Sequence, residues 1–339
     1  MIISRLLAVL TFVAATFSIP PARAANPLPA GVFAREYTGW NPTIHLSHSD
    51  TRARAVIAPQ VGGRIVHYSL SGENIIFENA SAFGLTIGGT NRNFWVGGYQ
   101  CDLGPELRNL PEHRELWMGP WTWSAPRDYT VKTESPPDAK MGVQLEKEFL
   151  FDPDTGDLGI VQRMKNISDR EVDYCLWDRT LSRGGGFALI PLKSRSRFKA
   201  GWSMRRPVDG SYIYEGEKPA SPQVKIISGV LVTKTVGEAT KLGTDSDAGW
   251  IAYARGKLLF IKYFPVTAGG NYSDGGNTVE LYFDLRVAEL EPLSPEVRLA
   301  PGKSYEFPEK WILIELDKDV ITFEDARRLV KKIPPSPFK

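Results

Sequence analysis

The sequence has few of the residues from which metal and thiol sites are built. Its 339 residues include four histidines and two cysteines. There is no H-E-x-x-H and no C-x-x-C pair, which argues against a dedicated zinc site. A G-x-S-x-G elbow and a Walker loop are also missing. We therefore expect neither a bound metal nor a cofactor.

The two cysteines, Cys101 and Cys175, leave two interpretations open. An exported protein can join such a pair in a disulfide. The alternative is two buried thiols, because the sequence does not say how far apart the two side chains lie in the fold.

Long apolar runs are also scarce, and the one that stands out is at the N-terminus. Residues 1–24 contain Arg5, an apolar run over 6–19 and then Ala22-Arg23-Ala24. This pattern predicts a secretory signal peptide cleaved after Ala24, with an uncleaved anchor as the alternative. The run of about 14 residues is short for a membrane span. We therefore expect a periplasmic or secreted protein with no integral membrane insertion once the signal is removed.

Excess charge of either sign is missing as well. The chain has 41 basic and 39 acidic residues, and loss of Arg5 and Arg23 with the signal leaves 39 of each. A balanced mature chain gives no electrostatic reason to expect nucleic acid or an anionic membrane surface as a partner.

What the sequence does have is a series of short strand patterns with many turns. Glycine (31) and proline (25) are frequent, and apolar residues alternate with polar ones over 143–152, as they do in a half-buried strand. Further strand patterns cover 53–59, 64–70, 158–166, 172–181, 224–234, 250–264, 278–291 and 305–316. These patterns predict an all-β chain, with residues 25–320 as one β-sandwich domain rather than two domains.

A helical pattern is confined to the C-terminus. Residues 321–333 carry Leu329 and Ile333 four residues apart, with Thr322 as the expected N-cap and Asp325 at position N3. We expect residues 321–339 to form a short helix and a loose tail.

The segment Asn91–Trp123 is the most unusual stretch of the chain. It holds four of the nine tryptophans among charged residues, and it is too irregular for strands. A sugar site needs aromatic faces for the C–H surface of the ring and charged groups for its hydroxyls. The alternative is that the tryptophans fill the core. The candidates from this segment are Arg92, Trp95, Glu106, His113 and Trp117.

Two glutamates near the C-terminus, Glu289 and Glu291, stand two residues apart in a strand pattern and therefore share one face. If the strand runs unbroken from Leu281, that face is otherwise apolar, and carboxylates there need a partner or a function. A break near Asp284–Arg286 would weaken this inference. The alternatives are a salt bridge to Arg286 or Arg298, or simple surface exposure.

Three stretches together resemble galactose-mutarotase-like proteins. They are APQVGGRIVHYSLSGENIIF, LEKEFLFDPDTGDLGIVQRMKNISDREVDY and ELEPLSPEVRLAPGKSYEFPEKWIL. The resemblance spans roughly residues 54–316 and is strongest to a bacterial branch of that superfamily with no assigned activity. It implies a large antiparallel β-supersandwich that binds a sugar on a concave sheet.

The resemblance also implies roles for single residues. In mutarotases a glutamate takes the proton of the anomeric hydroxyl and a histidine donates one to the ring oxygen. The glutamate position falls on Glu291 and the arginine position on Arg64. The stretch that carries the acid histidine in the family reads YCLWDRT here, with Trp177 and Asp178 but no histidine. Asp178 or His113 are the remaining candidates for the acid.

The sequence thus predicts a site with catalytic Glu291, Asp178 and His113, and with Arg64, Arg92, Trp95, Glu106, Trp117, Trp177 and Glu289 as substrate-binding residues. Three functions remain open. The first is an epimerase-like enzyme, or a hydrolase or lyase, acting on a carbohydrate. The second is a carbohydrate-binding protein without catalysis. The third is a structural or interaction module of the cell envelope.

Overall fold

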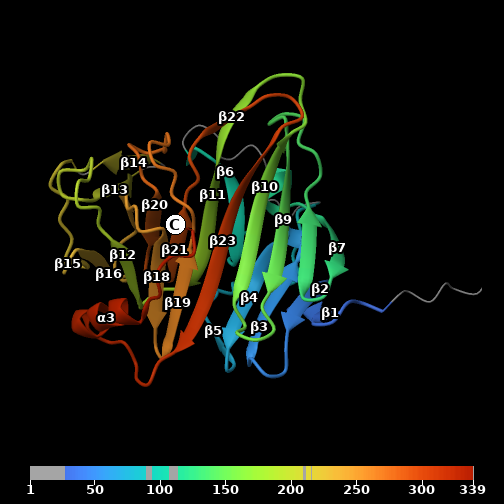
Figure 1. Ribbon diagram of the computed structural model, residues 1–339, viewed down its shortest axis with the longest axis horizontal. Helices are drawn as coiled ribbons and strands as arrows, with labels where there is room; N and C mark the ends of the chain where they lie inside the picture. The colour runs from blue at the N-terminus through green and yellow to red at the C-terminus, as the bar shows by residue number, and fades with distance from the viewer. Residues whose placement is uncertain (1–26, 89–93, 107–113, 209–210, 215, 339) are drawn as a thin grey trace, which may run out of the picture.

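The computed structural model describes residues 27–88, 94–106, 114–208, 211–214 and 216–338 (Figure 1). The predicted signal peptide at 1–24 lies outside these residues. In the described part of the chain, the strands form two antiparallel sheets that pack face to face. The prediction of an all-β sandwich is confirmed.

The larger sheet has 13 described strands, most of them along one path. In spatial order the path is β1 (Val32–Tyr37), β2 (Trp40–Ser47), β3 (Ala53–Ala58), β4 (Arg64–Leu70), β6 (Tyr99–Gly104), β11 (Val172–Arg183), β21 (Val287–Pro292), β20 (Val279–Phe283), β17 (Thr240–Thr244), β13 (Ser203–Val208) and β14 (Ser211–Tyr214). Two short strands lie off this path: β5 (Glu73–Asn74) pairs with β4, and β22 (Val297–Leu299) pairs with β11.

The smaller sheet has ten described strands. Their order is β15 (Val224–Ile227), β16 (Val230–Lys234), β12 (Phe187–Pro191), β18 (Trp250–Arg255), β19 (Leu258–Tyr263), β23 (Ser304–Glu315), β10 (Leu158–Asn166), β9 (Val143–Phe151), β8 (Thr130–Glu134) and β7 (Thr122–Arg127). In β9 the buried residues are every second one, as the sequence pattern predicts. Their side chains meet those of the larger sheet in one core.

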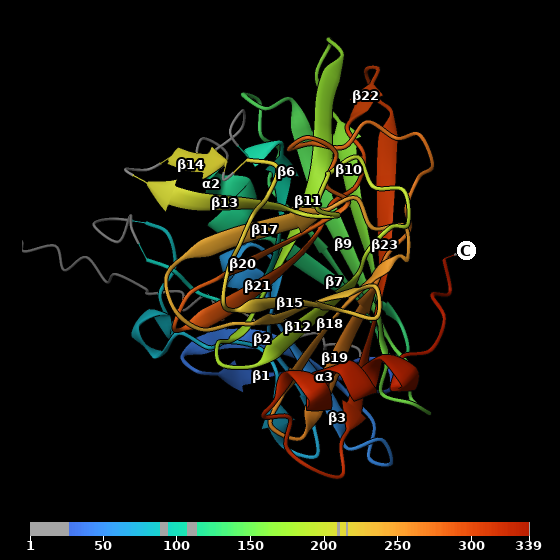
Figure 2. The same ribbon diagram turned by 90° about the vertical axis from the view of Figure 1, so that its left-hand side faces the viewer.

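Helix α3 (Phe323–Leu329) lies on the outer face of the smaller sheet, followed by the 3₁₀ turn η3 (Val330–Lys332) (Figure 2). Thr322 caps it as predicted, since its hydroxyl accepts a bond from the Asp325 amide and the Asp325 carboxylate accepts one from the Thr322 amide. Ala326 and Leu329 pack on strands β12 and β16 of that sheet. The central strands are therefore buried on both faces. No helix within the described ranges is both long and apolar enough to cross a bilayer.

One predicted strand is a hairpin in the structure. The pattern over 278–291 divides into β20 and β21, because Asp284 accepts hydrogen bonds from the amides of Arg286 and Val287 and closes a turn. The unbroken strand considered above is therefore wrong. Leu281 points into the core, whereas Glu289 and Glu291 point out of the opposite face of the larger sheet.

Candidate functional site

Five neighbouring strands of the larger sheet, β6, β11, β21, β20 and β17, carry polar side chains on their outer face. Apolar residues such as Tyr99, Leu176, Leu281 and Leu290 alternate with them and face the core. The polar residues are Gln100, Asp102, Trp177, Arg179, Lys241, Glu280, Tyr282, Glu289 and Glu291. The other face of these strands packs in the core. So many charged side chains gathered on the outer face indicate a site.

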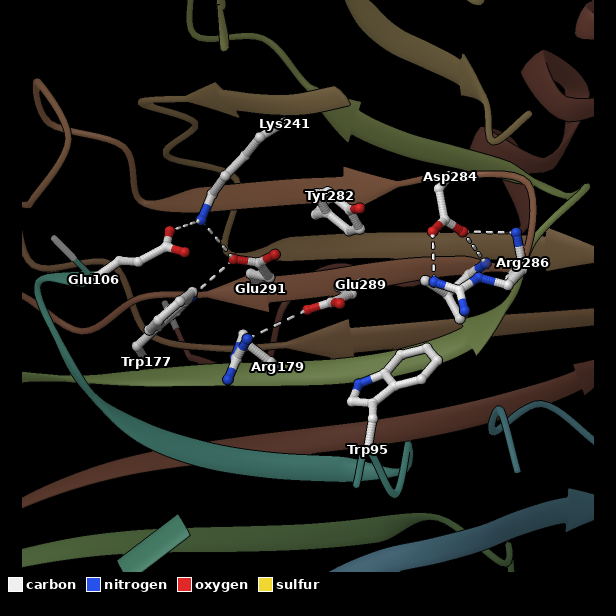
Figure 3. Close-up of a pocket in the computed structure, with 11 residues that line it drawn as sticks. Trp95, Glu106, Trp177, Arg179, Lys241, Tyr282, Asp284, Arg286, Glu289 and Glu291 are labelled. Carbon is white, nitrogen blue, oxygen red and sulfur yellow. Dashed lines mark hydrogen bonds and ion pairs between the residues drawn. The ribbon is translucent and has the colours of Figure 1, made fainter. Parts of the chain in front are cut away.

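This outer face is hollowed by a cavity of about 400 Å³ (Figure 3). That volume is in the range of small-molecule sites. The cavity is lined by Trp95, Glu106, Trp177, Arg179, Lys241, Tyr282, Asp284, Arg286, Val287, Glu289 and Glu291. Five of the residues predicted from the sequence are in this set, namely Trp95, Glu106, Trp177, Glu289 and Glu291.

Lys241 is the electrostatic centre of the cavity. Its Nζ lies 2.6 Å from Oε2 of Glu106, 2.9 Å from Oε2 of Glu280 and 3.2 Å from Oε2 of Glu291. Burial lowers the pKa of Lys241, but these three carboxylates together raise it well above its ordinary value of 10.5. The side chain therefore stays protonated at ordinary pH. Its ion pairs with Glu280 and Glu291 link strand β17 to strands β20 and β21.

Glu291 has two buried partners. The indole Nε1 of Trp177 donates a hydrogen bond of 2.8 Å to its Oε2, the oxygen that also faces Lys241. Burial raises the pKa of Glu291 from 4.5 to about 8, against the effect of Lys241 and with the help of neighbouring carboxylates. Near neutral pH this carboxyl group is thus able both to give and to take a proton, which is the property of an acid–base catalyst.

Arg179 stands beside Trp177 on the cavity floor, with its guanidinium stacked 4.5 Å from the Trp177 ring. Its Nε and one terminal nitrogen donate to the same oxygen of Asp102, at 2.8 and 2.5 Å. The other terminal nitrogen lies 3.8 Å from Glu289. The guanidinium is therefore fixed from behind by Asp102 and keeps a donor directed at the cavity.

Trp95 forms the rim of the cavity. Its ring stacks on Phe77 with the centroids 5.0 Å apart, and the guanidinium of Arg286 lies 5.3 Å from the ring centroid. Arg286 is in turn paired with Asp284 at 3.2 Å. An indole above a polar floor is the arrangement that the sequence predicted for a sugar site.

The structure does not bring Arg64 to the cavity. Its side chain is buried and donates to three backbone carbonyls, those of Val61 in η1 (Pro59–Val61), Gly97 and Trp117. Burial lowers its pKa to about 10, so it stays charged. Arg64 instead stabilises the Gly97-Gly98 turn, which lies next to Trp95 in the sequence, through its bond to the Gly97 carbonyl. Gly98 has φ +76°, and a Cβ there would lie 2.5 Å from the Ile65 carbonyl oxygen.

Asp178 also lies away from the cavity. It follows Trp177 in β11 and so faces the opposite side of the sheet, where Lys262 donates to it and also to Thr180 at 2.7 Å. Burial and the nearby Glu309 raise the pKa of Asp178 well above its ordinary value. Because a sheet separates it from the cavity, Asp178 has no path to a ligand there, and we do not assign it the acid role.

The other predicted residues are placed as follows. Trp117, in helix α2 (Arg114–Met118), donates to Gln100 at 2.6 Å and stacks against Arg179 at 5.1 Å, so it supports the cavity from one side. Trp121 is in the core. Arg92 and His113 lie outside the described residues, and their predicted roles stay predictions. Cys101 and Cys175 are both free and buried.

Lys241 was not among the predicted site residues, and Arg179 had no predicted role. Lys241 lies in a short strand, TKLGT, without any motif. Arg179 could have been predicted from the sequence, because it lies two residues after Trp177 in a strand and its side chain must therefore share the face of Trp177. Within the described residues, no group of three or more histidine, cysteine or acidic side chains is placed to hold a metal ion.

Comparisons with known proteins support the fold. No family model and no curated protein matches the sequence. Among solved structures, Slr1438 from Synechocystis sp. PCC 6803 superposes with a TM-score of 0.57 at 14% identity, over 84% of this chain and 99% of that one. A galactose mutarotase-like protein from Lactobacillus casei gives 0.54 at 10% identity, over 80% and 100%. A galactose mutarotase related enzyme from Lactobacillus acidophilus gives 0.54 at 9% identity, over 81% and 99%.

This chain has the galactose mutarotase-like fold. The resemblance found in the sequence is thereby confirmed at the level of architecture. Since the identities are 14% or lower, the superpositions show the fold alone, and activity has to be argued from the cavity.

Proposed function

We propose that the cavity binds a sugar and that Glu291 exchanges a proton with its anomeric hydroxyl group. The observation that carries this proposal is Glu291 itself, a buried carboxyl group that lines a cavity of about 400 Å³ and whose pKa is raised to about 8. The solved structures of similar fold, which include a galactose mutarotase-like protein, support a sugar as the ligand.

The chemistry follows from the groups on the cavity floor. Ionised Glu291 takes the anomeric proton, the bond from C1 to the ring oxygen breaks, and C1 becomes a carbonyl. Negative charge then develops on the ring oxygen. Arg179 is fixed by Asp102 and donates a hydrogen bond to that oxygen, while water in the open cavity supplies its proton. When the ring closes on either face of the carbonyl, the ring oxygen returns its proton to water and Glu291 returns its proton to the carbonyl oxygen, which gives either anomer.

A carbohydrate-binding protein without exchange is the second candidate. Among the described residues that line the cavity there is no histidine, although the mutarotase resemblance implies one as the acid. If Arg179 does not replace that acid, the cavity binds a sugar without opening its ring. The two candidates share the first experiment and differ in the pH experiment that follows it.

The binding site can be located through indole NMR signals. Addition of a bound sugar should shift the Nε1–H signals of Trp177, which bonds Glu291, and of Trp95 at the rim. The Trp311 signal is the internal control, because its indole donates to Glu309 between the sheets. Assignment needs only the Trp→Phe variants. If saturating sugar leaves Trp177 and Trp95 unshifted, or moves Trp311 as much, the proposed site is wrong.

The pH dependence of exchange should report Glu291. Since the ionised form is the base and its pKa is about 8, the exchange rate should rise about tenfold per pH unit up to that value and then level off. Trp177→Phe removes a hydrogen bond to the ionised form and should move the midpoint up by about one unit. Anomer exchange NMR from pH 5 to 10 measures both. A rate that falls as the pH rises, or an unmoved midpoint, contradicts this role.

Export is a separate proposal that rests on the sequence of residues 1–24. N-terminal sequencing of the protein recovered from bacterial periplasm or medium should begin at Ala25. Recovery of the chain only from the cytoplasm would contradict it.

A further inference from the structure

The charges around the cavity are unbalanced. Its lining carries four carboxyl groups, on Glu106, Asp284, Glu289 and Glu291, and three cations, on Arg179, Lys241 and Arg286. Two more carboxyl groups stand directly behind, Glu280 on Lys241 and Asp102 on Arg179. Six carboxyl groups against three cations leave an excess of up to three negative charges, of which the one on Glu291 appears only as the pH rises toward about 8.

Each of these cations already faces a carboxylate of the protein. Lys241 contacts three, Arg179 contacts Asp102 and Glu289, and Arg286 contacts Asp284. A uronic acid or a sugar phosphate entering here would have to displace one of these carboxylates. The negative field of the others would oppose it. The cavity therefore disfavours anionic sugars.

Among the described residues that line the cavity, Glu289 is the carboxylate with the longest ion pair. Its only ion pair within the described residues is the long one to Arg179, at 3.8 Å, and no hydrogen bond to it is described. The residue is 8% exposed and lines the cavity, with Glu291 beside it (Figure 3). Burial raises the pKa of Glu289, because the charged form lacks the partners that water would give it. A carboxylate in this position is stabilised by a cationic or hydrogen-bond-donating ligand.

We infer that the ligand is an amino sugar, a 2-amino-2-deoxyhexose whose ammonium group binds Glu289. This inference rests on the proposed function. Glu289 and Glu291 lie on one face of β21, about 6.8 Å apart along the strand. Side chains that leave the strand at that spacing on one face can reach neighbouring substituents of one pyranose ring. With the anomeric hydroxyl at Glu291, the substituent at Glu289 is the one on C2.

Binding measured by isothermal titration on residues 25–339 near neutral pH tests the inference without any variant. Glucosamine should bind at least about tenfold more tightly than glucose, because a charge-assisted hydrogen bond replaces a neutral one. N-acetylglucosamine keeps a nitrogen on C2 but in a larger, uncharged acetamido group, and should gain nothing over glucose. Glucuronic acid should bind more weakly than glucose.

Glu289→Gln keeps the shape of the side chain and should remove the preference for glucosamine over glucose, measured as the ratio of the two affinities within the variant. Glu315→Gln, an exposed carboxyl at the end of β23, is the control and should keep the preference. If free glucosamine binds more tightly than glucose, the site is assigned to monosaccharides. If only the β-1,4-linked glucosamine dimer binds more tightly, the site is assigned to the end of a chain. Equal affinity for glucose, glucosamine and glucuronic acid overturns the amino-sugar inference alone. No binding by any of them overturns the proposed function with it.

Discussion

Lys241→Met should lower the free energy of unfolding by about 3–5 kcal/mol, the range for removing one partner of a buried ion pair. The ammonium lies within 3.2 Å of three carboxylates, those of Glu106, Glu280 and Glu291, and all four side chains are buried. Methionine fills similar space but leaves the carboxylates facing one another. Urea unfolding followed by circular dichroism measures the loss. Lys199→Met, which breaks an exposed pair with Glu217, should change stability by about 1 kcal/mol or less.

The loss in Lys241→Met should also depend on pH in a defined direction. Burial already raises the pKa of Glu291 from 4.5 to about 8 in the folded protein, and removal of the ammonium raises it further. A carboxyl group whose pKa is raised on folding destabilises the protein as the pH rises through its folded value. The difference between variant and parent should therefore grow as the pH rises above about 8, where Glu291 is ionised in the parent but still protonated in the variant, and be smaller below that pH. A difference that does not vary with pH would mean that Lys241 acts through packing alone.

Glu291→Gln should reduce anomeric exchange by about 10²- to 10⁴-fold, the usual contribution of a general base. The amide keeps an oxygen that the Trp177 indole can donate to, so the cavity should keep its shape and its affinity for sugar. Exchange and affinity are then separated in one variant. Glu315→Gln, the exposed control, should exchange at the parent rate. A variant with unchanged exchange would exclude Glu291 as the base, and one without affinity would show that the side chain positions the sugar.

Much of the fold was predictable because it follows from short-range patterns. The alternation in β9 and the capping box at Thr322 are local features, and both are confirmed. The hairpin between β20 and β21 was not resolved, since Asp284 and Arg286 continue the alternation of the pattern even though they form the turn. Glu289 and Glu291 were correctly predicted to share one face, whereas the face shared with Leu281, expected only for an unbroken strand, is not formed.

The cavity itself was only partly predictable, because its cations come from strands far apart in the sequence. Trp177 and Glu291 are 114 residues apart, yet the indole bonds the carboxylate because β11 and β21 are neighbours. Lys241 reaches the same carboxylate from β17, two strands further. Arg64 and Asp178 show the converse, since the resemblance and the chemistry of their side chains suggested a role in the site. Asp178 faces the interior because alternate residues of a strand face opposite sides, and Arg64 is buried where it donates to the carbonyl of Gly97.

The most direct measurement is two-dimensional exchange NMR of anomeric signals, with residues 25–339 added to free aldoses, hexosamines and uronic acids. We predict exchange faster than in buffer for an amino or neutral sugar, and its loss in Glu291→Gln but not in Glu315→Gln. Exchange at the buffer rate for every sugar, or equal exchange by the parent and Glu291→Gln, would contradict this prediction.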